Sequence, residues 1–209
     1  MRLVNAHEMR ALEAAADAAG HGYARMMDLA GAAVAEAAWP WIGGGAAVIL
    51  CGPGNNGGDG LVAAARLAER GVAVRAVLWR RDAGSDRNAD RRANEARAAG
   101  AEIVAWASDT ADGVPEAWLA DADVVVDALL GTGARLPLPP ELAELLVRAA
   151  GARSGPRRAR VVAVDLPTGI DADTGRADPA ALAADVTVAF GHAKPGHVLP
   201  PGATHAGRL

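Results

Sequence analysis

The 209-residue sequence is poor in cysteine, lysine and aromatic side chains, and these shortages exclude several classes of protein. A single cysteine, Cys51, can form neither an intramolecular disulfide nor a zinc site built on several cysteines. The 21 basic residues include one lysine, Lys194, a bias that we attribute to genomic base composition. The formal net charge of −4 argues against a nucleic-acid or anionic-membrane partner. With 3% aromatic residues, the core must consist mainly of valine, leucine and alanine.

Long hydrophobic runs are also absent. The longest, at 46–51 and at 124–130 around Asp127, are far shorter than the roughly 20 residues that span a membrane. The amino-terminal segment MRLVNAHEMRALEAA lacks the apolar stretch of a signal peptide, so we expect a cytoplasmic protein. A chain of this length can form one stable core, and we expect a single domain over residues 1–209.

Hydrophobic spacing indicates how the chain is organised. Apolar residues at helical spacing predict two leading helices, at 6–19 and 23–39. Further along, the sequence predicts strands at 46–51, 72–78, 102–106, 124–127, 161–165 and 186–190, and helices at 61–70, 89–99, 116–120 and 141–150. Strands that alternate with helices favour right-handed crossovers. The predicted fold class is therefore α/β, a three-layer αβα arrangement with a mostly parallel sheet and two leading helices.

A glycine-rich run, GPGNNGGDG at 52–60, directly follows the first predicted strand. Gly52, Gly54 and Gly57 satisfy G-x-G-x-x-G in the context that a dinucleotide-binding fold requires. Glycines allow positive φ and let backbone N–H groups approach an anion, to which the next helix adds its dipole. A tight strand-to-helix turn explains the same run equally well. A Walker A loop is excluded, because no lysine follows the glycines.

Aspartates end two further predicted strands. Asp127 precedes the run ALLGTG, and Asp165 precedes LPTGID. A carboxylate at the end of an apolar strand needs a partner, so each either caps the local backbone or binds a cation or proton. Because ligands bind beyond the carboxyl ends of parallel strands, we favour one site shared by the two aspartates.

These segments together resemble the YjeF amino-terminal domain, the NAD(P)H-hydrate epimerase family. The resemblance rests on the runs at 52–60, 126–133 and 164–171, with support from 9–13, 27–31, 187–191 and 194–196, and it spans nearly the whole chain. It implies a Rossmann-like sheet. It also implies an enzyme that interconverts the R and S epimers of hydrated NADH and NADPH, from which a separate dehydratase restores the cofactor.

The resemblance further implies roles for single residues. The hydrated dinucleotide would contact Asn55, Asn56, Gly57, Gly58, Asp59, Gly131, Thr132, Gly133, Ala134, Arg135, Leu136, Pro137 and Asp165. One potassium ion per subunit would be held by Asn56, Asp127 and Thr168, since a hard cation prefers amide, carboxylate and hydroxyl oxygens. The family usually has serine at the position of Thr168, and threonine retains the hydroxyl.

Proton transfer at the reacting hydroxyl is assigned to Asp165, with Lys194 as the competing candidate. Burial at the end of an apolar strand is expected to raise the pKa of Asp165. The cation is expected to keep Asp127 ionised, and the helix dipole is expected to do the same for Asp59.

The resemblance also implies partners. Family members form homodimers, and the apolar residues Met26, Met27 and Leu29 permit this. An ADP- or ATP-dependent NAD(P)H-hydrate dehydratase is expected, either separate or fused to the carboxyl end. In the fused case, residues 1–209 are a fragment of a bifunctional enzyme.

Two alternative functions stay open. An NADP-dependent oxidoreductase would use the glycine motif, with Arg80 and Arg81 placed for a 2′-phosphate. The absence of the second half of such a sheet argues against it. A non-catalytic nucleotide-binding module is the other alternative, and the intact set Asn56, Asp127 and Asp165 argues for retained catalysis.

Overall fold

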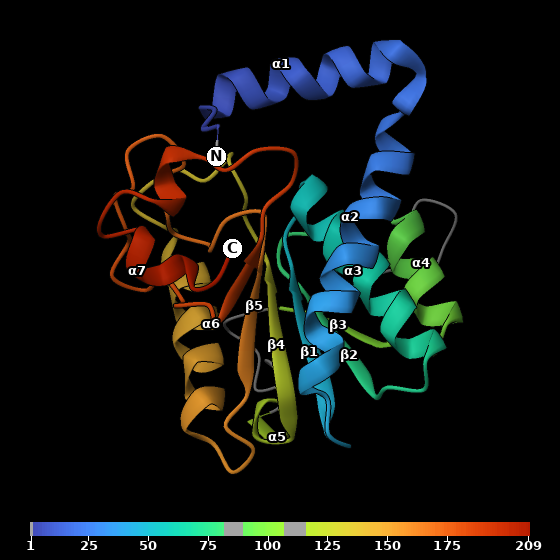
Figure 1. Cartoon of the computed structure of the whole chain (residues 1–209). Coiled ribbons are helices and arrows are strands. Elements are labelled where there is room, and N and C mark those ends of the chain that lie inside the picture. Colours follow the sequence, from blue (N-terminus) through green and yellow to red (C-terminus); the bar gives the residue numbers. More distant parts are fainter. Residues whose placement is uncertain (1, 82–89, 107–115) are drawn as a thin grey trace.

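The protein is described by a computed structural model that covers residues 2–81, 90–106 and 116–209. Six strands form one sheet in the order β3-β2-β1-β4-β5-β6, and all five neighbouring pairs are parallel (Figure 1). The strands are β1 (Ala46–Cys51), β2 (Val74–Leu78), β3 (Glu102–Ala105), β4 (Ala122–Ala128), β5 (Arg160–Val164) and β6 (Val186–Val188). The predicted fold class is confirmed.

This order contains both halves of a dinucleotide-binding sheet, because β1 lies between β2 and β4 and the order reverses there. The expectation that the second half is absent is therefore wrong. Strand β6 is only three residues long, but it completes the sheet beside β5.

Helices cover both faces of the sheet (Figure 1). They are α1 (Ala6–Ala16), α2 (Tyr23–Ala38), α3 (Asn55–Glu69), α4 (Arg91–Ala98), α5 (Glu116–Ala120), α6 (Pro140–Gly151) and α7 (Ala203–Ala206). Shorter helical turns are η1 (Asp17–His21), η2 (Trp39–Trp41), η3 (Ala152–Ser154) and η4 (Pro195–His197). None of the helices in the described residues is both long and apolar enough to cross a membrane.

The central strands contribute to two cores, because successive side chains point to opposite faces. Ile49 packs with helices α2, α3 and α4, whereas Val48 and Leu50 pack with α5 and α6. The six side chains of β1 are all buried, as expected for a central parallel strand. This arrangement fixes the carboxyl ends of β1, β4 and β5 at one edge of the sheet.

Helix α3 differs most from its prediction, because it begins at Asn55 rather than at 61. The glycine-rich run is thus mostly helical. A Cβ at Gly60 would lie 2.5 Å from the Cβ of Ala128, so the helix approaches β4 more closely than side chains would allow. Tertiary packing here overrides the low helix propensity of glycine. Helix α4, in contrast, agrees with the helix predicted at 89–99, of which residue 89 lies outside the described residues.

The leading helices form an arm over the carboxyl edge of the sheet. Asn5 caps α1 by accepting from the backbone of Glu8, whose side chain accepts from the backbone of Asn5. Gly20, at φ +92°, turns the chain toward α2. Figure 1 shows α1 lying across the top of the molecule, beyond the ends of the strands.

Candidate functional site

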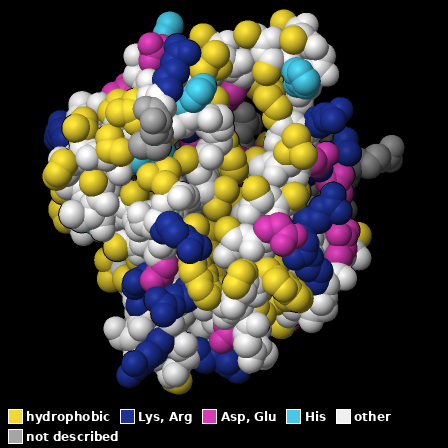
Figure 2. All heavy atoms as spheres, viewed as in Figure 1, with side chains coloured by type: hydrophobic (Ala, Val, Ile, Leu, Met, Phe, Trp, Pro, Cys, Tyr) yellow, Lys and Arg dark blue, Asp and Glu magenta, His cyan; other side chains and the backbone are white. Residues whose placement is uncertain are grey.

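A cavity of about 890 Å³ lies between this arm and the carboxyl edge of the sheet. Its walls come from α1, α2, the start of α3 and the segments that follow β1, β4, β5 and β6. In Figure 2 hydrophobic side chains border the hollow below α1, whereas charged side chains gather on the flank. The cavity lies at the point where the strand order reverses, which is where open α/β sheets bind ligands.

The structure brings seven of the predicted contact residues to this cavity. They are Asn55, Asn56, Asp59, Gly131, Thr132, Gly133 and Asp165. A Cβ at Gly131 would lie 3.1 Å from Oδ1 of Asn56 and 3.3 Å from Oδ2 of Asp165. The segments that follow three different strands therefore converge at one point, and a Cβ at Gly131 would be in tight contact with both side chains.

The other predicted contact residues do not line the cavity. Gly57 and Gly58 are buried behind it, and 134–137 extend beyond the cavity wall. Gly57 lies in α3 without positive φ, contrary to expectation. It must be glycine for another reason, because a Cβ there would lie 2.0 Å from the carbonyl oxygen of Gly52.

Asp127 and Thr168 form a fully buried pair beside the cavity. The backbone N–H of Thr168 donates to Asp127 Oδ2 at 2.8 Å, and its hydroxyl donates to Oδ1 at 2.6 Å. The backbone of Leu129 also donates to Asp127, and that of Leu130 donates to the hydroxyl of Thr168. All these donors are neutral. Burial therefore raises the pKa of Asp127, although the hydrogen bonds act against the rise.

The chemistry of this pair, together with Asn56, fits a hard cation. The Nδ2 atom of Asn56 is buried and has no partner among the described residues, so its amide is free to turn its oxygen inward. Carboxylate, hydroxyl and amide oxygens are ligands that such a cation prefers. Within residues 2–81, 90–106 and 116–209, no group of three or more His, Cys, Asp or Glu side chains is arranged to hold a metal ion.

Asp165 and Lys194 form an ion pair at the end of β5. Asp165 has φ +62°, a left-handed conformation that is uncommon outside glycine and that clusters at functional sites. Lys194 Nζ lies 2.5 Å from Asp165 Oδ1 and also donates to the carbonyl of Phe190. Lys194 is fully buried, whereas Asp165 borders the cavity. The two competing candidates for proton transfer are thus in direct contact.

His197 holds this pair in place, and the sequence analysis missed it. Its Nδ1 accepts from the backbone N–H of Lys194 at 2.9 Å, so the ring proton lies on Nε2, which donates to the carbonyl of Asp165 at 2.7 Å. Burial lowers the pKa of His197, consistent with this neutral tautomer. In the sequence, only the short run KPGH at 194–197 could have indicated that His197 positions Lys194 and Asp165.

The protonation state of Asp59 differs from the ionised form that the sequence predicts. Burial, reinforced by the charges of Asp165 and Glu13, raises its pKa to about 8 against the opposing effect of Arg81 and Arg92. The carboxyl group is thus mainly protonated at neutral pH. Asp59 is the fifth residue of α3, beyond the first turn in which the helix dipole acts, so the expected ionised form is not favoured.

Arg81 holds the glycine-rich turn from outside. Its Nη1 donates to the carbonyls of Gly52 at 2.8 Å and Gly54 at 2.9 Å, and its guanidinium pairs with Asp90. Arg80 pairs with Glu141. Both arginines are committed to the protein, which removes the support for a 2′-phosphate site there.

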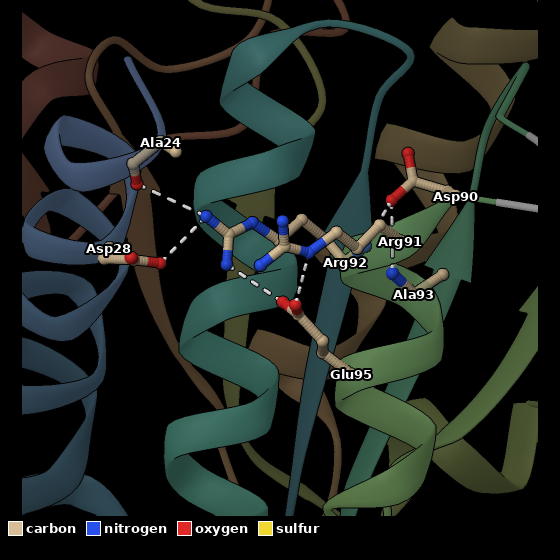
Figure 3. A network of polar contacts seen from close by, with 7 residues as sticks. All are labelled: Ala24, Asp28, Asp90, Arg91, Arg92, Ala93 and Glu95. Atoms are coloured by element: carbon tan, nitrogen blue, oxygen red, sulfur yellow. Dashed lines mark hydrogen bonds and ion pairs between the residues drawn. The ribbon is translucent and has the colours of Figure 1, made fainter. Parts of the chain in front are cut away.

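Arg92 joins the helices around the site. Figure 3 shows its side chain reaching from α4 across α3 to α2, where it pairs with Asp28 at 2.8 Å and donates to the carbonyl of Ala24. It also pairs with Glu95 on its own helix. Asp90 caps α4 by accepting from the backbone of Arg92 and Ala93.

The fold and the site define an αβα protein of the dinucleotide-binding type, with a ligand cavity at the switch point of its sheet. The family described as YjeF-related protein N-terminus matches residues 23–196, and the chain belongs to it. The crystal structure of yeast YNL200c has the same fold, with a TM-score of 0.79 and 23% identity over 95% of this chain and 84% of that one.

Named relatives extend the comparison. An NAD(P)H-hydrate epimerase of Clavibacter michiganensis is 38% identical over 98% of this chain and 86% of its own length. An NAD(P)H-hydrate epimerase of Rhodobacter capsulatus is 39% identical over 93% of this chain and 91% of its own length. The bifunctional NAD(P)H-hydrate repair enzyme Nnr of Thermofilum pendens is 38% identical over the whole chain, which spans 39% of that enzyme's length.

Proposed function

We propose that this protein is an NAD(P)H-hydrate epimerase, which interconverts the R and S forms of hydrated NADH and NADPH. The observation that carries the proposal is the convergence of Asn56, Gly131 and Asp165 on one cavity. Two relatives with this name match the chain over most of their own length. The cavity volume is within the range of small-molecule sites.

The chemistry is a change of configuration at the carbon beside the ring nitrogen. The nitrogen lone pair can stabilise an iminium-like intermediate when the hydroxyl leaves, and water then adds from the opposite face. Asp165 touches the reacting group in this proposal. Its side chain borders the cavity, and its Oδ1 lies 2.5 Å from Lys194 Nζ, so it is placed to accept the proton of the incoming water.

Potassium is the cation that we propose for Asn56, Asp127 and Thr168. When bound, it would supply positive charge beside the site and offset the burial of the Asp127 carboxylate. The proposal is supported by the neutral surroundings of Asp127 and by the unpartnered amide of Asn56.

The proposed partners follow from the relatives. An NAD(P)H-hydrate dehydratase, separate or fused, would act on one of the two epimers, and bifunctional relatives exist that are longer than this chain. A homodimer is proposed as well, supported by the exposure of Leu29 on α2. A cytoplasmic location stays a prediction.

Purified S and R hydrates of NADH and NADPH test the function. Each is incubated with the protein, and the epimers are separated by chromatography. We expect both to approach the same mixture faster than without protein, and the Asp165→Asn variant to lose most of this activity. Unchanged epimer ratios would contradict the proposal and favour a binding module. Hydride transfer to common alcohols or acids would instead favour the oxidoreductase.

A further inference from the structure

Asp59 is a largely buried carboxyl group at the wall of the cavity. No basic side chain among the described residues forms an ion pair with it. It is 8% exposed and lines the same cavity as Asp165. No side chain or backbone group in the described ranges donates a hydrogen bond to it, whereas Asp127 accepts three. Its hydrogen-bonding capacity is therefore available to a molecule in the cavity.

We propose that Asp59 is the acid that protonates the departing hydroxyl, while Asp165 accepts the proton of the incoming water. The inference rests on the proposed epimerase function. Asp59 comes from α3 and Asp165 from the end of β5, and Glu13 of α1 also lines the cavity, so carboxyl groups reach it from different elements. Carboxyl groups on different elements suit an epimerisation, because the hydroxyl leaves one face of the ring and water arrives at the other.

Burial, reinforced by neighbouring charges, keeps Asp59 protonated. Asp165 and Glu13 are negative neighbours that raise its pKa together with burial. Arg81 and Arg92 lower it, but each guanidinium is already paired, with Asp90 and with Asp28. Lys194 lies against Asp165 rather than Asp59. The result is a pKa of about 8, which leaves the acid form dominant at neutral pH.

The step is balanced without any co-reactant. The C–O bond breaks, its electron pair leaves with the oxygen, and the proton of Asp59 converts the departing hydroxide into water. The nitrogen lone pair forms the C=N bond of the iminium. Water adds to that carbon from the opposite face and returns the electron pair to nitrogen, and its surplus proton goes to the Asp165 carboxylate. No atom is oxidised or reduced.

After one turnover, the proton has to return from Asp165 to Asp59 before the next one begins. The addition of water leaves the proton on Asp165, whose Oδ1 lies 2.5 Å from Lys194 Nζ. Asp59, now ionised and buried, favours the neutral form. The proton therefore returns from Asp165 to Asp59 through water in the cavity.

The test measures kcat and KM of the full chain against pH, with each purified epimer and above the uncatalysed rate. Wild type should lose activity above pH 8 as Asp59 ionises. Asp59→Asn should lower kcat by about 100-fold or more, the usual contribution of an acid catalyst, with little change in KM. Asp59→Glu should recover part of kcat with a displaced alkaline limb. Glu69→Gln, an exposed change on the same helix, is the control and should behave as wild type.

A titration of carbon-13-labelled aspartate carboxyls in wild type checks ionisation directly, independent of any variant's folding. Asp59 should titrate near pH 8. A value near the ordinary one of about 4 would overturn the inference. So would wild-type kcat in Asp59→Asn, or a defect of that variant confined to KM. If wild type itself fails to interconvert the epimers, the proposed function fails instead, so the two failures are distinguishable.

Discussion

At the scale of single residues, burial raises the pKa of both Asp127 and Asp59, but the hydrogen bonds to the two carboxyl groups differ. Asp127 is enclosed and accepts hydrogen bonds from Thr168 and Leu129, which stabilise its charged form. Asp59 has no such donors in the described part of the chain and borders the cavity. Hydrogen bonds therefore act against the rise in the pKa of Asp127, whereas no hydrogen-bond donor in the described residues acts against the rise in the pKa of Asp59.

Asp127→Asn should remove the proposed effect of potassium on stability. Wild type should melt at a higher temperature in potassium chloride than in choline chloride, because a ligand that binds only the folded state stabilises it. The variant should lose this difference. It should also lose about 1–3 kcal/mol of unfolding free energy, because an amide cannot satisfy all the buried donors around it.

Asp178→Asn is the matched control. Asp178 is also buried and accepts from the backbone of Leu138 and Ala180, so the variant should lose stability but keep the potassium effect. A wild type with equal melting temperatures in both salts would contradict the cation assignment.

Asp59→Asn should change how stability depends on pH. The folded-state pKa of about 8 is above the unfolded value, so the native state binds the extra proton between the two. Wild-type unfolding free energy should therefore fall as pH rises from about 4 toward 8, by up to about 1.4 kcal/mol per pH unit from this group. Urea unfolding at several pH values should show a flatter profile in the variant. Identical profiles would contradict the raised pKa.

At the scale of elements, the start of α3 depends on how closely the chain can approach itself. Gly57 packs on the carbonyl of Gly52, and Gly60 on Ala128. Arg81 then ties the carbonyls of Gly52 and Gly54 to the chain beyond β2. The turn that presents Asn56 to the cavity is thus held from both sides.

Gly57→Ala should destabilise the fold by about 1–3 kcal/mol, because the new methyl group would meet a backbone oxygen. Urea unfolding measures this. Gly54→Ala is the control for stability, since a Cβ there meets nothing within 4 Å. Equal stability of the two variants would show that the turn can relax.

Arg81→Gln should act on binding through the glycine-rich turn. Without the guanidinium the two carbonyls lose a charged donor, and we expect KM for the hydrate to rise about tenfold, or ~1.4 kcal/mol, with a smaller change in kcat. Arg80→Lys, at an exposed neighbour paired with Glu141, should leave KM unchanged. A loss of thermal stability with an unchanged KM would reduce Arg81 to a structural role.

At the scale of the whole molecule, the arm of α1 and α2 makes the cavity. Without it, the strand ends would form an open edge rather than an enclosed site. The arm also carries Leu29, which is 64% exposed. An apolar side chain on an exposed helix is consistent with contact to a second subunit.

Leu29→Glu should therefore weaken the proposed homodimer. Sedimentation velocity should show a dimer for wild type and a larger monomer fraction for the variant, because a charge would be buried in the interface. Val147→Glu, at an exposed position of α6, is the control and should remain dimeric. A monomeric wild type would contradict the homodimer.

The sequence by itself determined the architecture and the place of the site. Strand and helix periods are local, and a buried parallel strand such as Ala46–Cys51 is recognisable from its own residues. Since the ends of parallel strands share one edge, the positions of Asn56, Asp127 and Asp165 indicated a common site before any coordinates. The resemblance then supplied the chemistry.

Only the tertiary structure decided what each site group can do. It placed Lys194 against Asp165 from 29 residues away, and it brought His197 beneath that pair. It also kept Asp59 protonated and started α3 within the glycine run. These properties depend on desolvation, distant charges and close backbone contacts, which arise only when remote segments meet and therefore leave no periodic pattern in the sequence.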